Sequence, residues 1–339
     1  GDWTPEIEPY FFKKAQIGSF SQYKVSGFSY ICHPLPTMKK FSLLLLCVLF
    51  FASQTADAQR WKRQRYEFSI GGGVSNFLGE LGGANQIGTN YFKDLEWSQT
   101  RMALAIGLRY KLTDYFALNS HLTYGRVSGD DKLTKEPFRS YRNLNFFSDI
   151  YEFNLNFEGA VQKEQVGHRY RLRNVRGLRG YELYTYGFVG IGVFYFDPKT
   201  EYNGQIISLR PLGTEGQGQI ETRKTYSTLG VCVPAGIGFK YTIDRYWGVG
   251  IEIGLRKTFT DYIDDVSTTY YDFTDPNSLS AQLGNRSNPL NVPSGEEYVI
   301  PSTQPGQQRG DPRDNDSYMF GIFSINYKIV GKGGRRMHF

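Results

Sequence analysis

Residues 259–270 (FTDYIDDVSTTY) combine three carboxylates with several hydroxyl groups in a short stretch. Calcium coordination, paired-carboxylate catalysis on a glycoside and the capping of backbone N–H groups in a turn all use such residues. The spacing of Asp261, Asp264 and Asp265 lacks the carboxylate pattern and the glycine of an EF-hand loop. Nothing in the sequence indicates a carbohydrate groove. Turn capping is therefore the favoured interpretation, and a loose calcium site at these three aspartates is the alternative.

Other catalytic groups are few. After residue 58 the histidines are His121, His168 and His338, and no Gly-x-Ser-x-Gly, His-Glu-x-x-His or Cys-x-x-Cys motif occurs. His121 lies in an alternating segment, which predicts a hydrogen-bonded interior residue. We predict that the protein is not an enzyme and uses no cofactor. The alternative is an outer-membrane acyltransferase or protease, which would need a histidine or aspartate beside a serine at the outer rim.

The elements that position these residues are strands, because apolar residues alternate with polar residues or glycine. Segment 247–256 (WGVGIEIGLR) sets five large apolar residues against Gly, Glu and Arg on the opposite face. A content of 38 Gly and 16 % aromatic residues also suits a β protein with tight turns. The predicted strands are 66–76, 101–111, 117–127, 147–158, 183–196, 226–241, 247–256 and 318–329.

Such an even series predicts an all-β fold, an eight-stranded antiparallel transmembrane β-barrel with long extracellular loops. A soluble barrel or sandwich would turn the same apolar face inward. The membrane version is favoured because the charged face is also rich in glycine, which suits a narrow lumen. Aromatic residues at the strand ends suit the two membrane interfaces: Tyr110, Tyr124, Trp247 and Tyr327.

Connections of alternating length orient this barrel. Short connections around 113–115 and 244–246 are expected to be periplasmic turns, and the long ones extracellular loops. The predicted loops are 79–100, 129–146, 197–225 and 259–317. The middle of the last loop, from Asn285 to Gly310, is rich in Asn, Pro, Ser, Gln and Gly, so we expect local disorder there.

The N-terminal part contains an export signal. Residues 38–58 (MKKFSLLLLCVLFFASQTADA) have a basic start, an apolar run and an Ala-x-Ala site, which predicts a cleaved signal peptide. Residues 1–37 precede it and are expected to be a disordered upstream extension from an over-long reading frame. Residues 59–339 then form one barrel domain with a C-terminal tail at 331–339. We expect an outer-membrane protein of a Gram-negative bacterium, in contact with outer-membrane lipids. The formal charge of +6 is too weak to predict nucleic-acid binding.

One periplasmic connection is long and basic. Residues 162–180 (QKEQVGHRYRLRNVRGLRG) follow the fourth strand, and strand parity places them in the periplasm. A solvated loop is one interpretation of this segment. The other is a docking patch for an acidic periplasmic partner, formed by Arg169, Arg171, Arg173, Arg176 and Arg179.

Several segments share a pattern: 211–218 (PLGTEGQG), 260–272 (TDYIDDVSTTYYD), 73–83, 128–152, 196–199 (FDPK), Arg309-Gly310 and Ser317-Tyr318. These segments resemble the PorG-like (DUF6089) outer-membrane barrel family, and the resemblance extends over about 66–330. The matching loop residues are Glu215, Gly216, Gln217, Gly218, Thr260, Asp261, Tyr262, Asp264, Asp265, Arg139, Arg142 and Asn143. The resemblance implies a non-enzymatic component of the type IX secretion or gliding machinery, linked to a periplasmic ring made by a lipoprotein and its partner.

Both acidic loop motifs would lie at the same mouth of the barrel. We therefore expect Glu215 and the three aspartates to meet Arg139 or Arg142 and to form a polar plug that orders the extracellular loops. Replacing Asp264 and Asp265 by alanine is expected to leave barrel insertion intact and to make the loops more sensitive to protease.

Overall fold

The computed structural model describes residues 64–81, 97–134, 136–164, 183–244, 246–291 and 295–330. All of them belong to a compact unit that spans Ala58–Phe339. The predictions for 1–37, for the signal peptide at 38–58 and for the tail at 331–339 lie outside the described residues. The five arginines of the basic connection, between 165 and 182, also lie outside them.

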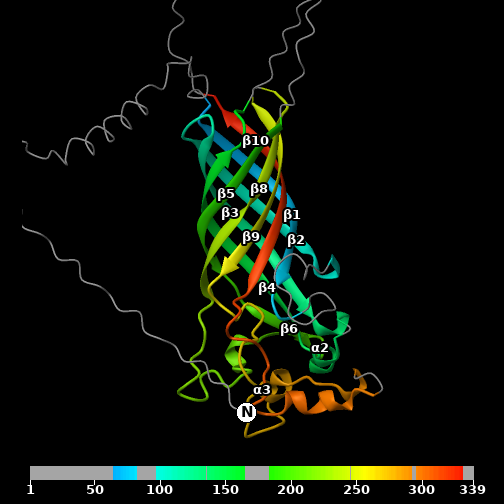
Figure 1. Cartoon of the computed structure of the whole chain (residues 1–339). Coiled ribbons are helices and arrows are strands. Elements are labelled where there is room, and N and C mark those ends of the chain that lie inside the picture. Colours follow the sequence, from blue (N-terminus) through cyan, green and yellow to red (C-terminus); the bar gives the residue numbers. More distant parts are fainter. Residues whose placement is uncertain are drawn as a thin grey trace, which may run out of the picture. The chain divides into compact units, whose positions relative to one another are not determined.

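Eight strands close into an antiparallel barrel (Figure 1), which confirms the predicted fold class. Each strand pairs with its neighbours, and β1 closes the barrel against β10 in a register that runs from Tyr66 opposite Ile329 to Leu78 opposite Ser317. The strands are β1 (Tyr66–Leu78), β2 (Arg101–Lys111), β3 (Phe116–Asp130), β4 (Asn145–Ala160), β5 (Leu183–Tyr195), β8 (Leu229–Thr242), β9 (Trp247–Thr258) and β10 (Ser317–Ile329).

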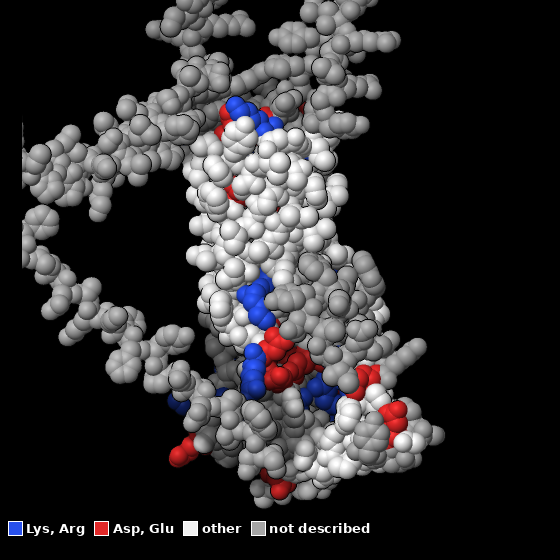
Figure 2. All heavy atoms as spheres, in the orientation of Figure 1, with Lys and Arg blue, Asp and Glu red and all other residues white. Residues whose placement is uncertain are grey.

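The direction of the side chains distinguishes a membrane barrel from a soluble one. Large apolar side chains point outward, with exposed fractions of 69 % for Met102 and 68 % for Ile191. Charged side chains point into the lumen, where Glu152 and Glu158 are both 0 % exposed. A barrel in water would reverse this arrangement, because buried charge is costly and exposed apolar area is unfavourable. The visible wall of the barrel is largely uncharged, and charged residues gather toward its ends (Figure 2).

Pro234 lies inside β8, where a proline cannot donate a ladder hydrogen bond. The pairing of β5 with β8 runs to Val189 opposite Ala235 and resumes at Gly192 opposite Cys232. The interruption falls at the proline, and the strands keep the same register on both sides of it.

The long connection after β5 contains a hairpin that the sequence analysis treated as loop. Strand β6 (Pro198–Tyr202) pairs with β7 (Gln205–Ser208) around Asn203 and Gly204, which both have positive φ. An Asn-Gly pair with this backbone is the preferred two-residue hairpin turn. Strand β6 also pairs with the start of β4, at Phe147 and Ser148. The hairpin therefore continues the sheet along β4 past the end of β5.

The described residues of the long connections form what we call the loop cap: 79–81, 131–144, 196–228 and 259–316. Its short helices are η4 (Asp131–Leu133), α2 (Pro137–Arg142), η5 (Arg210–Leu212), α3 (Leu279–Gly284), η6 (Pro289–Asn291) and η7 (Glu297–Thr303), and η3 (Trp97–Gln99) precedes β2. No described helix is long and apolar enough to span a membrane.

The expected disorder between Asn285 and Gly310 is not found in the described part of that range, which forms η6, η7 and turns. The polar side chains there bond backbone groups, as Asn285 Nδ2 does to the Thr303 carbonyl at 2.9 Å. The correction has a physical reason. Asparagine favours disorder when it faces water, but here the side chains of Asn285, Asn288 and Asn291 satisfy backbone groups within a folded loop.

Candidate functional site

The lumen is filled by paired charges. One group lies at the end of the barrel where β1 begins and β10 ends. There, Arg109 Nε donates a hydrogen bond to Glu158 Oε2 at 2.5 Å, and Arg109 Nη2 donates one to the Tyr184 hydroxyl at 2.6 Å. Lys240 Nζ donates to Glu67 Oε1 at 2.8 Å. These groups come from different strands, so side chains cross the lumen and exclude an open channel there.

A second layer of paired charges lies toward the loop cap. Arg256 Nε is 3.3 Å from Glu152 Oε1, and the Tyr318 hydroxyl donates to Glu152 Oε2 at 2.7 Å. The Arg256 guanidinium also lies over the Phe320 ring, 4.7 Å from its centre. A buried carboxylate requires such counter-charge and hydrogen bonds. The two layers together make the barrel a solid support for its loops.

His121 lies in the barrel wall, in the middle of β3. Its Nδ1 is 3.7 Å from Glu252 Oε1, and Glu252 Oε2 accepts a hydrogen bond from the Tyr186 hydroxyl at 3.0 Å. Gly107 lies opposite His121 in the register, and a Cβ on Gly107 would be 2.4 Å from the imidazole. The imidazole is therefore enclosed in the lumen and is not a histidine at the outer rim.

Glu215 lies at the centre of the loop cap and is 0 % exposed. Its Oε1 accepts hydrogen bonds from Arg309 Nη1 and from the Ser267 N–H, each at 2.9 Å. Its Oε2 accepts from the Thr268 N–H at 3.0 Å and from the Thr268 hydroxyl at 2.6 Å. The two acidic loop motifs therefore meet, and one carboxylate organises the backbone of the other motif.

Both carboxylate oxygens of Asp265 also accept hydrogen bonds. It accepts hydrogen bonds from the Thr214 hydroxyl at 2.5 Å and from the Tyr226 hydroxyl at 2.7 Å. Its φ of 63° is in the left-handed region, which a short polar residue tolerates best. Burial raises the pKa of Asp265 to about 6, while Arg309 and the two hydroxyl donors act in the opposite direction.

The remaining residues of the two motifs build tight turns. Gly216 and Gly218 have φ values of 80° and 75°, and a Cβ on Gly216 would be 2.6 Å from the Tyr271 ring. The Gln217 side chain accepts a hydrogen bond from the Glu215 N–H at 2.9 Å. Glycine is required at Gly216 both by its backbone and by the close approach of Tyr271.

Tyr262 and Thr260 join the motifs to their surroundings. The Tyr262 ring stacks on Tyr226 with 4.5 Å between ring centres. The Thr260 carbonyl accepts a hydrogen bond from the Asp316 N–H at 3.0 Å. This contact ties the start of the last loop to its end.

The predicted pairing of Glu215 with Arg142 was wrong. Arg142 binds Asp131 at 2.8 and 2.9 Å and donates to the carbonyls of Glu80 and Arg309 at 3.0 and 2.9 Å. It does not pair with Glu215, because Asp131, in the same connection, provides a nearer carboxylate. Sequence reasoning missed the partner that Glu215 uses, since Arg309 is distant in sequence and lies in a polar segment.

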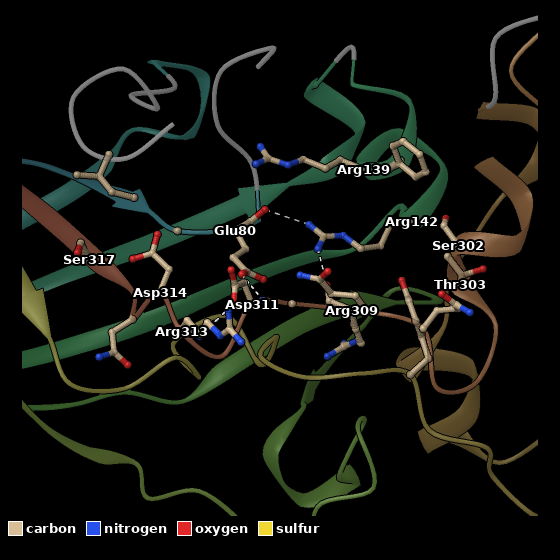
Figure 3. Close-up of a pocket in the computed structure, with 18 of the residues that line it drawn as sticks. Glu80, Arg139, Arg142, Ser302, Thr303, Arg309, Asp311, Arg313, Asp314 and Ser317 are labelled. Atoms are coloured by element: carbon tan, nitrogen blue, oxygen red, sulfur yellow. Dashed lines mark hydrogen bonds between the residues drawn. The ribbon is translucent and has the colours of Figure 1, made fainter. Parts of the chain in front are cut away.

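Arg139 lies within α2, and Asn143 follows the helix. The Asn143 side chain donates to the Arg286 carbonyl at 3.1 Å, and its φ of 56° ends α2. Arg139 lines a pocket at the cap surface (Figure 3).

Further carboxylates lie within the loop cap itself. Both oxygens of Asp261, Oδ2 of Asp264 and Oδ1 of Asp316 are buried and have no hydrogen-bond partner. Burial and the neighbouring Asp264 raise the pKa of Asp261 to about 9, and burial raises the pKa of Glu80 to about 7. Sequence reasoning missed Glu80 and Asp316, which adjoin strands β1 and β10 without a distinctive motif.

The calcium alternative is not supported by this arrangement. Within the described ranges, no group of three or more Asp, Glu, His or Cys residues could hold a metal ion. Asp265, the third predicted ligand, directs both oxygens to hydroxyl donors. The three aspartates therefore do not converge on one point.

A polar pocket of about 860 Å³ opens at the cap surface beside the end of β1. Figure 3 shows Arg139 on one side and Arg313 with Asp311 on another, while Arg142 connects the Glu80 and Arg309 carbonyls between them. Ser302, Thr303, Gln307 and Gln308 add uncharged polar groups. Leu78, Phe138 and Tyr270 add apolar surface, so the lining is mixed.

Comparison with solved structures gives several small outer-membrane barrels. OprG from Pseudomonas aeruginosa is 9 % identical, with a TM-score of 0.33, covering 79 % of this chain and 98 % of that one. Ail from Yersinia pestis is 9 % identical, with a TM-score of 0.33, covering 78 % and 99 %. These likenesses are too distant to carry an inference about function. No curated protein of similar sequence was found.

The family comparison is more direct. The model of the outer membrane protein beta-barrel domain matches residues 43–286, which include every strand except β10. The match agrees with the closed barrel, its apolar outer wall and its charged lumen. The chain therefore belongs to the outer membrane protein beta-barrel domain family, and its place is the outer membrane.

Proposed function

We propose that this protein is a non-enzymatic structural component of a type IX-like secretion or gliding complex and docks periplasmic ring partners. The observation that carries the proposal is the burial of both PorG-like loop motifs in one network. Glu215 receives its hydrogen bonds from Ser267, Thr268 and Arg309. Residues that match a family motif and also build the cap support a role for that cap as a rigid surface.

The filled lumen supports a structural role over a transport role. Paired charges cross the barrel at two levels, so solute diffusion would require several buried ion pairs to break. The position of His121 inside the lumen removes this histidine as a catalytic group at the outer rim. A component that holds partners needs neither an open lumen nor a catalytic centre.

The test is co-purification from outer membranes in mild detergent. Charge reversal at Arg171 and Arg173 is expected to release periplasmic ring proteins, because it reverses the field of the basic connection. Charge reversal at Lys132 and Lys224, which are exposed in the cap, is the matched control and is expected to retain them. Purification of the wild-type protein as a solitary barrel would contradict the proposal.

A second candidate is a stand-alone barrel whose loops bind a ligand at the cell surface. The polar pocket of about 860 Å³ favours it. In that case, changes in the 259–317 loop would abolish function, whereas the Arg171 and Arg173 reversals would have no effect. The same pair of variants therefore distinguishes the two candidates.

A further inference from the structure

The carboxylate cluster consists of Glu80, Asp261, Asp264 and Asp316, which join the first and last connections of the cap. The three aspartates are 6 %, 1 % and 1 % exposed, so water does not solvate them well. A Cβ on Gly79 would lie 2.5 Å from Asp316 Oδ1, which shows that this oxygen faces the backbone of the first connection. Burying a carboxylate without partners is costly while it is charged.

The three aspartates of the cluster have fewer hydrogen-bond donors than their oxygens require. Asp264 Oδ1 accepts from the Val266 N–H and Asp316 Oδ2 accepts from the Ile263 N–H, both at 2.9 Å, and each carboxylate has a second oxygen with no partner. Asp261 has neither oxygen bonded, although the nearby Ser267 hydroxyl lowers its pKa. Glu80 Oε1 accepts from the Asp311 N–H. A proton on these groups would turn an unpaired acceptor into a donor.

The cations around the cluster are engaged elsewhere. Arg142, from α2, binds Asp131, and Arg309, from the last loop, binds Glu215. Both arginines lower the pKa of Asp264, but burial and the charge of Glu80 outweigh them and hold that pKa well above its usual range. The pKa of Asp316 is raised in the same direction, by burial and then by Asp264 and Asp261.

Other carboxylates face the cluster and add to the effect. Asp311, in the last loop, and Glu215, in the connection after β5, both raise the pKa of Glu80 by their charge. Glu215 also raises the pKa of Asp261. Negative charge therefore faces the cluster from two connections of the cap.

We propose that the carboxylate cluster is a pH-operated latch, which holds the first and last connections of the cap together when protonated and releases them when it ionises. The inference goes beyond the proposed function and does not depend on which partner the barrel serves. The latch faces the cell exterior, because the long connections of such barrels are extracellular.

The direction of the pH effect follows from linkage. Raised pKa values mean that the folded cap retains protons that the unfolded loops release, since unfolded carboxyls titrate at about 4. The stabilisation that the protonated cluster gives to the folded cap is therefore fully present below about pH 4. It declines as the pH rises through about 7 for Glu80 and about 9 for Asp261.

The experiment measures proteinase K cleavage of the last loop in the purified full-length barrel, from pH 6 to pH 10. Each rate is divided by that for unfolded casein at the same pH, which removes the pH dependence of the protease. Heat-modifiable migration shows that the barrel stays folded. The wild-type rate is expected to rise at least about tenfold, because one unit of pKa shift corresponds to a tenfold change in an equilibrium.

The variant Asp261→Asn/Asp264→Asn/Asp316→Asn is expected to abolish most of this rise, because amides do not ionise and can donate hydrogen bonds. If the triple variant does not fold, Asp261→Asn alone is expected to reduce the rise. The control is Asp272→Asn, an exposed residue of the same loop, which is expected to behave as wild type.

Three results would overturn the latch. They are a flat wild-type profile, an unchanged rise in the folded asparagine variants, and protection at pH 10 by added CaCl₂ together with loss of protection at pH 7 in EDTA. The last result would mean that a cation, and not protons, neutralises the cluster.

Discussion

Arg309 connects three parts of the loop cap through one guanidinium. Its Nη1 donates to Glu215 Oε1 at 2.9 Å and to the Asp265 carbonyl at 2.5 Å, and its Nε donates to the Gly284 carbonyl at 3.2 Å. Both Arg309 and Glu215 are buried, so neither can exchange its partner for water. At the residue scale, the cap therefore depends on one charge pair.

Arg309→Met is expected to destabilise the cap by about 3–5 kcal/mol, because it leaves Glu215 buried without its counter-charge. Hydrogen exchange of the Ser267 and Thr268 amides, which donate to Glu215, measures this effect. Adding Glu215→Gln should recover part of the loss, since the unpaired charge is removed. Arg313→Met, at an exposed arginine of the same loop, is the control. If the Ser267 and Thr268 amides exchange as slowly in Arg309→Met as in the wild type, Arg309 does not stabilise Glu215 in this way.

At the element scale, the β6–β7 hairpin extends the barrel wall and supports the last loop. Strand β6 pairs with β4 at only two positions, opposite Phe147 and Ser148. Beyond that pairing, Arg286 Nη1 donates to Asn145 Oδ1 at 2.9 Å and to the Thr200 hydroxyl at 3.0 Å. The hairpin therefore contributes more to the loop cap than to closure of the barrel.

Replacing 198–208 by a short Gly-Ser linker should leave the barrel folded and heat-modifiable, because all eight wall strands keep their pairing. Protease cleavage of the last loop should increase severalfold, since Arg286 loses the Thr200 hydroxyl. Replacing the exposed turn 219–222 by four Gly and Ser residues is the control. Equal cleavage in the two variants would show that the hairpin does not support the loop.

At the scale of the whole molecule, the barrel is a closed wall around a charged but filled lumen. Glu67, Arg109 and Glu158 lie within one buried group, and Glu152 with Arg256 forms another. Paired ions link side chains across the lumen, and an eight-stranded barrel has an interior just wide enough for side chains to fill. A lumen filled in this way is a poor path for solutes.

The purified protein is therefore expected to give no steady single-channel conductance in planar bilayers. A general diffusion porin, measured in the same membranes, provides the positive control. Reproducible ohmic steps from the wild-type protein would contradict a filled lumen. Arg256→Ala adds a sharper measurement, because it should lower the thermal stability of the barrel by leaving Glu152 unpaired.

The sequence by itself determined the positions of the strands. Residues that face lipid must be apolar and residues that face the lumen must be polar or small, so each strand carries a period of two that is visible locally. The predicted segment 247–256 became β9 (Trp247–Thr258), and 101–111 became β2 without change. The β6–β7 hairpin was missed although Asn203-Gly204 marks its turn, because its short strands carry too little alternation.

Only the tertiary structure decided the partners in the loop cap. That Glu215 and the aspartate motif share one mouth follows from strand parity, but the choice of Arg309 over Arg139 or Arg142 does not. It depends on how the last loop folds back over the barrel, which brings Arg309 within 2.9 Å of Glu215. The same folding buries Asp261, Asp264 and Asp316, each with at least one carboxylate oxygen that has no hydrogen-bond partner. Contacts between distant segments leave no periodic pattern in a sequence, because each depends on the path of the whole chain.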